Sequence, residues 1–201
     1  GAGLFLAFFI SKAKVMDAAE QALNPDLVRL RGLSPLVLLP ISNPANAQSM
    51  VFVANALAPP VVGRVMLLSI VIPPDETSPS LVQKQLQGTQ NALQQALMAS
   101  ISKQMKPDAL TTIAREPWGE IARVAEEHNC RSMLLGLSSL SESQTTENLE
   151  KLIHQVRCDV AIFRQPSVGW NITGARRVLI PVAGFSDHDA LRARIVGSLG
   201  R

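Results

Sequence analysis

Five short apolar runs alternate with stretches of helical periodicity along the middle of this sequence, and this alternation constrains the fold most. The runs are continuous rather than alternately apolar and polar, which is typical of strands buried on both faces of a sheet. Strands separated by helices form a parallel sheet, and right-handed crossovers wind the helices onto both faces. We therefore predict an α/β fold with a doubly wound, parallel, five-stranded sheet. The predicted strands are 36–41, 64–71, 110–114, 132–135 and 160–163.

The segments between these runs predict helices. Pro117 suits the first turn of one helix and Asn129 suits its end. A longer helix over 81–103 should bury one apolar face and expose a glutamine-rich one. The expected buried face consists of Val82, Leu86, Leu93, Leu97 and Ile101.

The sequence of the first predicted strand is repeated, with substitutions, near the end of the chain. Leu38-Leu39-Pro40-Ile41 recurs as Leu179-Ile180-Pro181-Val182, and each copy is followed by a loop and by helical spacing. A self-similar strand–turn–helix at this separation indicates tandem α/β domains. We expect a complete domain at 34–164, a linker at 165–175 and the start of a second, truncated copy at 176–201.

The chain opens with an uninterrupted apolar run from Gly1 to Ile10, followed at once by Lys12 and Lys14. A membrane-spanning helix needs about 20 residues, and a signal peptide carries its positive charge before the apolar run. An apolar run followed by lysines is typical of the cytosolic exit of a transmembrane helix. We expect 1–14 to be the end of a truncated transmembrane helix with its exit, and 15–33 to be a connector; a buried N-terminal element is the alternative.

Charge and residue spacing argue against several classes of function. Between Pro35 and Phe163 the sequence contains nine Lys and Arg residues and eleven Asp and Glu residues. This part of the chain therefore lacks the excess of positive charge that a nucleic-acid-binding surface needs. The three histidines have no metal-ligand spacing with Cys130 and Cys158, and neither a P-loop nor a nucleophile elbow occurs. Two cysteines without a secretory signal fit a reducing compartment. We therefore predict no enzyme activity, no metal and no nucleic-acid partner.

A ligand site is nevertheless expected at one place in such a fold. Open α/β sheets bind ligands outside the carboxyl ends of the strands, where the winding reverses. We expect that reversal between the first and fourth strands, so the loops that follow these strands should form the crevice. The candidate ligand residues are Ser42, Asn43, Gly136, Ser138 and Ser139.

The order of these elements resembles the universal stress protein family. Residues 120–136 resemble the third helix and fourth strand of that family, and residues 156–162 resemble the entry to its last strand. The resemblance covers 34–164 and begins again at 176. It implies a Rossmann-like fold and domains that pair through the last strand, as a homodimer or as an intramolecular tandem.

Nucleotide-binding members of that family carry Asp after the first strand and Gly-x2-Gly-x9-Gly-Ser/Thr after the fourth. Here Ser42 takes the Asp position, Gly136 is the one matching glycine, and Ser139 replaces the second. Hydroxyl groups of the following loop could still donate hydrogen bonds, and Thr145 or Thr146 could cap the next helix. The resemblance thus implies a degenerate nucleotide site and no bound cofactor, with an adenine nucleotide as the alternative.

The order of features along the chain also resembles the C-terminal tails of secondary transporters. These features are an apolar exit, two lysines, a connector and paired stress-protein-like domains. Amino-acid permeases and cation–chloride cotransporter-like proteins of the amino acid–polyamine–organocation superfamily carry such tails, and residues 24–32 add to the resemblance. It implies a non-catalytic regulatory domain on the cytoplasmic side of the cell membrane, with its own transporter domain as partner. The alternative is a soluble tandem universal stress protein that binds ATP or another adenine nucleotide.

Overall fold

The computed structural model describes residues 34–58, 61–73, 79–137, 143–165, 172–174, 193 and 196–197. The chain divides into two compact units, Gly1–Ser34 and Pro35–Arg201, and every helix and strand named below belongs to the second. Three predicted segments lie outside the described residues: the membrane exit, the connector and the repeated strand sequence at 179–182. In the described part, no helix is both long and apolar enough to cross a membrane.

The described elements follow one another as the alternation of the sequence predicts. They are β1 (Leu36–Pro40), η1 (Pro44–Asn46), α4 (Ala47–Leu57), β2 (Arg64–Val71), α5 (Pro79–Ser102), β3 (Asp108–Ile113), α6 (Pro117–Glu127), β4 (Ser132–Gly136), α7 (Ser143–Gln155), β5 (Asp159–Phe163) and η2 (Ile172–Gly174).

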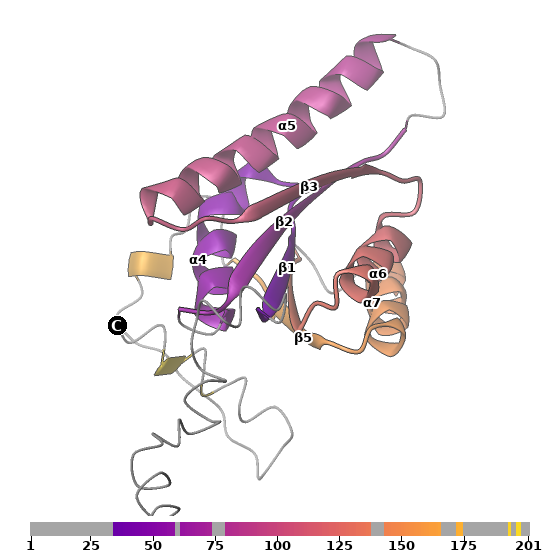
Figure 1. Ribbon diagram of the computed structural model, residues 1–201. Helices are drawn as coiled ribbons and strands as arrows, with labels where there is room; N and C mark the ends of the chain where they lie inside the picture. Colours follow the sequence, from indigo (N-terminus) through magenta and orange to yellow (C-terminus); the bar gives the residue numbers. More distant parts are fainter. Residues whose placement is uncertain are drawn as a thin grey trace, which may run out of the picture. The chain divides into compact units, whose positions relative to one another are not determined.

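All five strands are parallel, and their order across the sheet is β3-β2-β1-β4-β5. The chain therefore moves from β1 to one edge of the sheet and then returns to β4 on the other side of β1. Helices α4 and α5 cover one face of the sheet, and α6 and α7 cover the other (Figure 1). The predicted doubly wound sheet is confirmed, and its winding reverses between β1 and β4.

Strand β1 shows why these runs are continuously apolar. Val37 and Leu39 pack into the core under α4 and α5, whereas Leu36 and Leu38 pack into the core under α6 and α7. Each of the four side chains is at most 7% exposed. Burying a leucine or valine side chain contributes roughly 1.5–3 kcal/mol, so the two cores together favour this position of β1 at the centre of the sheet.

The predicted buried face of α5 is partly wrong. Leu93 and Leu97 are partly buried, but Leu86 and Ile101 are 38% and 63% exposed, and the side chain of Val82 lies outside the described residues. The side chains that α5 buries completely are small: Ala92, Ala96 and Ser100. Small side chains allow α5 to lie close to α4 and β2, so the contact face is shifted from the leucine stripe by one position.

The ends of the later helices follow local chemistry. Pro117 stands in the first turn of α6, as predicted, and Asn129 after its last turn has a φ of 48°, in the left-handed region that asparagine tolerates. The expected capping of α7 by Thr145 or Thr146 is wrong, because α7 begins at Ser143 and both threonines lie in its first turns.

Candidate functional site

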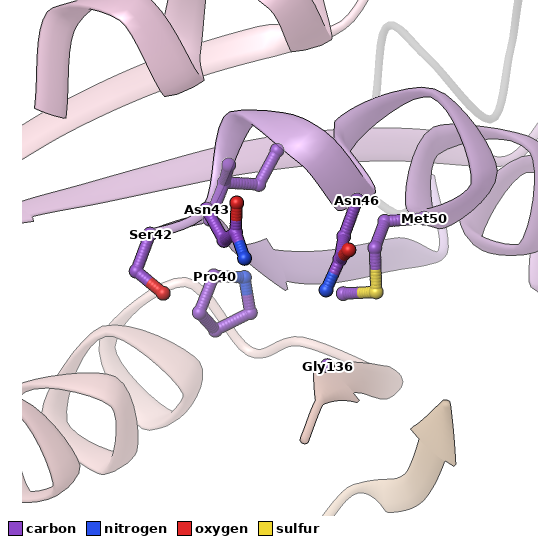
Figure 2. A pocket seen from close by; sticks show the side chains of 7 residues that line it. Pro40, Ser42, Asn43, Asn46, Met50 and Gly136 are labelled. Carbon is purple, nitrogen blue, oxygen red and sulfur yellow. The ribbon is translucent and has the colours of Figure 1, made fainter. Parts of the chain in front are cut away.

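A small pocket lies at the carboxyl ends of β1 and β4, where the winding of the sheet reverses (Figure 2). The structure brings three of the predicted residues, Ser42, Asn43 and Gly136, to this pocket. Ser138 and Ser139 lie outside the described residues. The remaining lining residues are Pro40, Ile41, Asn46 and Met50.

The turn between β1 and α4 sets the polar side of the pocket. The Ile41 N–H donates to the Leu68 carbonyl at 2.8 Å, which continues the ladder just beyond β1. Asn43 then caps η1, because its Oδ1 accepts from the Ala45 N–H at 2.9 Å. This bond leaves the Asn43 NH2 group as a donor. Asn46, directly before α4, makes no side-chain capping hydrogen bond.

Met50 closes the pocket from the side of α4. It is the fourth residue of that helix, is 4% exposed, and lies beside Asn46 and opposite Gly136 (Figure 2). A Cβ built on Gly136 would lie 2.8 Å from the Met50 Sδ and 2.9 Å from its Cε. Real side chains do not approach one another this closely, so the absence of a side chain at Gly136 is what lets the thioether pack over the end of β4.

The pocket is small. Its volume is about 20 Å³. A single water needs about 10–15 Å³ on this measure. The Met50 side chain lines the pocket at the reversal of the sheet.

The described lining of the pocket holds no charged side chain, no histidine and no cysteine. The groups that it offers are the side-chain amides, backbone groups and the Ser42 hydroxyl. Within the part of the chain that the structure describes, no three His, Cys, Asp or Glu side chains gather to hold a metal ion. The described pocket can thus bind through amide, hydroxyl and backbone groups.

The two cysteines lie at the other end of the sheet, just before β4 and β5. Burial, and to a smaller extent the nearby Cys158, raises the pKa of Cys130 to about 12. Burial also raises the pKa of Cys158 to about 11. Both thiols therefore stay protonated at neutral pH, which is the state of an inert core cysteine rather than that of a nucleophile.

Sequence reasoning missed Asn46 and Met50. Met50 was one of several apolar residues at helical spacing after the first strand, and this spacing indicates a core residue. The position of Met50 could have indicated its place in the pocket. In a doubly wound sheet, the first turn of the helix after the first strand lies where the winding of the sheet reverses. Apolar spacing alone does not distinguish a residue that faces the core from one that also reaches the pocket.

Comparison with solved structures shows which proteins share this fold. A universal stress protein from Archaeoglobus fulgidus matches with a TM-score of 0.52 at 12% identity, over 67% of this chain and 98% of that one. A member of the same family from Burkholderia pseudomallei matches with a TM-score of 0.50 at 18% identity, over 65% and 96% of the two chains. A universal stress protein in complex with cAMP matches with a TM-score of 0.50 at 15% identity, over 64% and 96%.

No family model matches the sequence, and no curated protein matches it either. The structural matches show that residues of the described domain adopt the universal stress protein fold, as the resemblance implied.

We predict that Gly136 and Met50 are energetically coupled. Gly136→Ala in the unmodified chain should lower the free energy of unfolding by about 1 kcal/mol or less, because the new methyl group meets the flexible end of the Met50 side chain, which can shift. In a Met50→Ala background the same change should cost less than about 0.5 kcal/mol, since residues in contact commonly show a coupling energy of about 0.5–3 kcal/mol. Urea unfolding of the four proteins, followed by circular dichroism, measures the cycle. Additive effects would contradict the contact.

Proposed function

We propose that this chain is a non-catalytic regulatory domain with a universal stress protein fold, on the cytosolic side of a membrane secondary transporter of the amino-acid or cation–chloride type. The described pocket supports the non-catalytic part of the proposal. It measures about 20 Å³, and its described lining is uncharged. A domain with such a crevice would act through contacts with other protein surfaces rather than by turning over a substrate.

The N-terminal sequence supports the membrane part of the proposal. An apolar run followed by Lys12 and Lys14 has the charge order of a cytosolic exit, although this segment lies outside the described residues. A domain that follows such an exit directly would be held at the membrane surface, next to the helices that it would regulate.

The edge of the sheet supports pairing as the means of regulation. Strand β5 is the outermost strand beside β4, and its Ile162 is 41% exposed. An exposed strand edge offers unpaired backbone groups to another strand. We propose that β5 pairs with a second copy, in a homodimer or in an intramolecular tandem. A homodimer predicts the mass of a dimer in light scattering of the full chain and a loss of that dimer in Ile162→Lys. A monomeric full chain would exclude the homodimer.

Removal of the domain tests the regulatory role. We expect that deleting residues 34–201 from the native membrane protein changes transport flux while the amount of protein at the cell surface stays the same. An exposed substitution such as Ile113→Ser, on the strand at the opposite edge of the sheet, is the matched control and should leave flux unchanged. Unchanged flux with unchanged surface abundance after the deletion would contradict a regulatory role, and recovery of the native protein without detergent would contradict the membrane attachment.

Adenine-nucleotide binding by a soluble tandem protein is the second candidate function. One structure with this fold is a universal stress protein in complex with cAMP. In this chain, Ser42, Asn43 and Gly136 meet in one crevice at the reversal of the sheet, where ligands bind in such folds.

Calorimetry separates the two candidates. Titration of the full chain with ATP, ADP and cAMP should give no binding in the micromolar range, because the described lining of the pocket holds no charged group for a phosphate. A micromolar dissociation constant for any of the three would favour the second candidate. ATP hydrolysis that is lost in Gly136→Val would contradict the non-catalytic proposal.

A further inference from the structure

We propose that the C-terminal end of α5 is a docking surface for an anionic lipid bilayer. This surface, the α5 patch, consists of Met98, Ile101, Lys103 and Lys106. The inference rests on the proposed function in one respect, that the domain lies at a membrane. It goes further by assigning the contact with the membrane to four residues of the folded domain and by naming the charge of the lipid.

Two large apolar side chains of α5 point away from the core. Ala92, Ala96 and Ser100 form the fully buried side of this helix. Met98 and Ile101 lie on its other side and are 62% and 63% exposed. Residues three positions apart are neighbours on a helix surface, so these two side chains form one apolar spot. Exposed apolar residues are usually scattered singly, and a pair of this size is typical of a binding surface.

The apolar spot is confined to the last turns of α5. Gln87, Asn91 and Gln94 precede Met98 on the same side of the helix and are exposed as well. The outward side is therefore polar along most of the helix and becomes apolar only near its end. A general tolerance for apolar residues on this side would not produce such a change.

The charge around the spot is positive. The sequence contains no Asp or Glu from residue 77 to residue 107. Lys103 and Lys106 are exposed, and neither forms an ion pair within the described part of the chain. The next carboxylate, Asp108, pairs with Arg64. Lysines close to a bilayer attract anionic lipids, so the patch matches the charge of such a surface.

The end of α5 holds the lysines next to the apolar spot. Gln104 has a φ of 58°, and its N–H donates to the Ile101 carbonyl at 2.9 Å. The Met105 N–H donates to the Ser100 carbonyl at 3.0 Å, and Met105 packs against the core. These two bonds are those of a Schellman motif, which ends a helix in a defined turn. Both lysines of the patch are therefore anchored within one short turn after Ile101.

A lipid surface suits this patch better than a protein partner does. Lysines at the end of a helix also stabilise its dipole, but that effect does not account for the exposed Met98 and Ile101. A stable protein interface buries about 800 Å² on each partner and usually centres on Trp, Tyr or Arg, none of which belongs to the patch. Peripheral binding to a bilayer needs only a small apolar insertion combined with attraction between charges.

Sedimentation of the full chain with vesicles tests the surface. The vesicles consist of phosphatidylcholine alone or of an equal mixture with phosphatidylserine. We expect Lys103→Gln/Lys106→Gln and Met98→Gln/Ile101→Gln each to weaken binding to the anionic vesicles by about tenfold. Glutamine is a good helix former, so both variants should keep α5. Lys151→Gln/Arg157→Gln, which removes the same charge from exposed positions in and just after α7, is the matched control and should bind as the unmodified chain does.

A second readout reports on the patch itself, because the apolar run at 1–10 can hold the chain on any vesicle. Hydrogen peroxide converts exposed methionine to its sulfoxide, and mass spectrometry measures the rate at each residue. We expect anionic vesicles to slow the oxidation of Met98 by about fivefold or more, and phosphatidylcholine vesicles to leave it unchanged. Lys103→Gln/Lys106→Gln should abolish this protection. Buried Met133 is the internal reference.

Three results would overturn the lipid surface. They are equal oxidation of Met98 with and without anionic vesicles, protection that survives Lys103→Gln/Lys106→Gln, and equal loss of binding in the patch variants and the control. Loss of a dimer in Met98→Gln/Ile101→Gln, with vesicle binding unchanged, would assign the patch to a second copy of the chain instead. Each of these results leaves the deletion experiment untouched, whereas unchanged flux after the deletion contradicts the regulatory role alone.

Discussion

The burial of β1 on both of its faces is the constraint on which the rest of the structure depends. Its four leucine and valine side chains divide between two cores, so helices must cover both sides of the sheet. A strand in this position needs neighbours at both edges, and the chain supplies β2 first and β4 only later. The reversal of winding, and with it the pocket at the ends of β1 and β4, follows from this central position.

The described pocket of this domain is small, and its lining is uncharged. The fold brings a turn with two asparagines and the glycine end of β4 together, which are groups suited to hold a ligand. Met50 then occupies the space, and Gly136 gives it room. A glycine at the end of a strand can thus serve a side chain of the protein itself instead of a bound phosphate, so its presence alone does not identify a nucleotide site.

The sequence predicts the strands well and the details of packing less well. Apolar runs identified β1, β2, β4 and β5, and a run with two threonines identified β3, whose residues alternate between partly buried and exposed. The prediction gave β2 at its observed bounds and the others within two residues at each end. Sequence periodicity predicted that the leucines of α5 face inward. The structure instead buries alanine and serine completely, because α5 lies close to α4 and β2 and only small side chains fit between them. The rule for ligand sites in such folds located Ser42, Asn43 and Gly136. It did not find Met50, because its role depends on how far a flexible side chain reaches from α4 across to β4.

The contact between Met50 and Gly136 is measured most directly by NMR of the full chain with ¹³C-labelled methionine methyl groups. The account predicts a nuclear Overhauser effect between the Met50 ε-methyl protons and the Gly136 α-protons, with the methyl signal assigned by its loss in Met50→Leu. The effect should persist when ATP is added. Absence of the effect in the unliganded chain, with the Met50 methyl at the chemical shift of a solvent-exposed methionine, would contradict the contact between Met50 and Gly136.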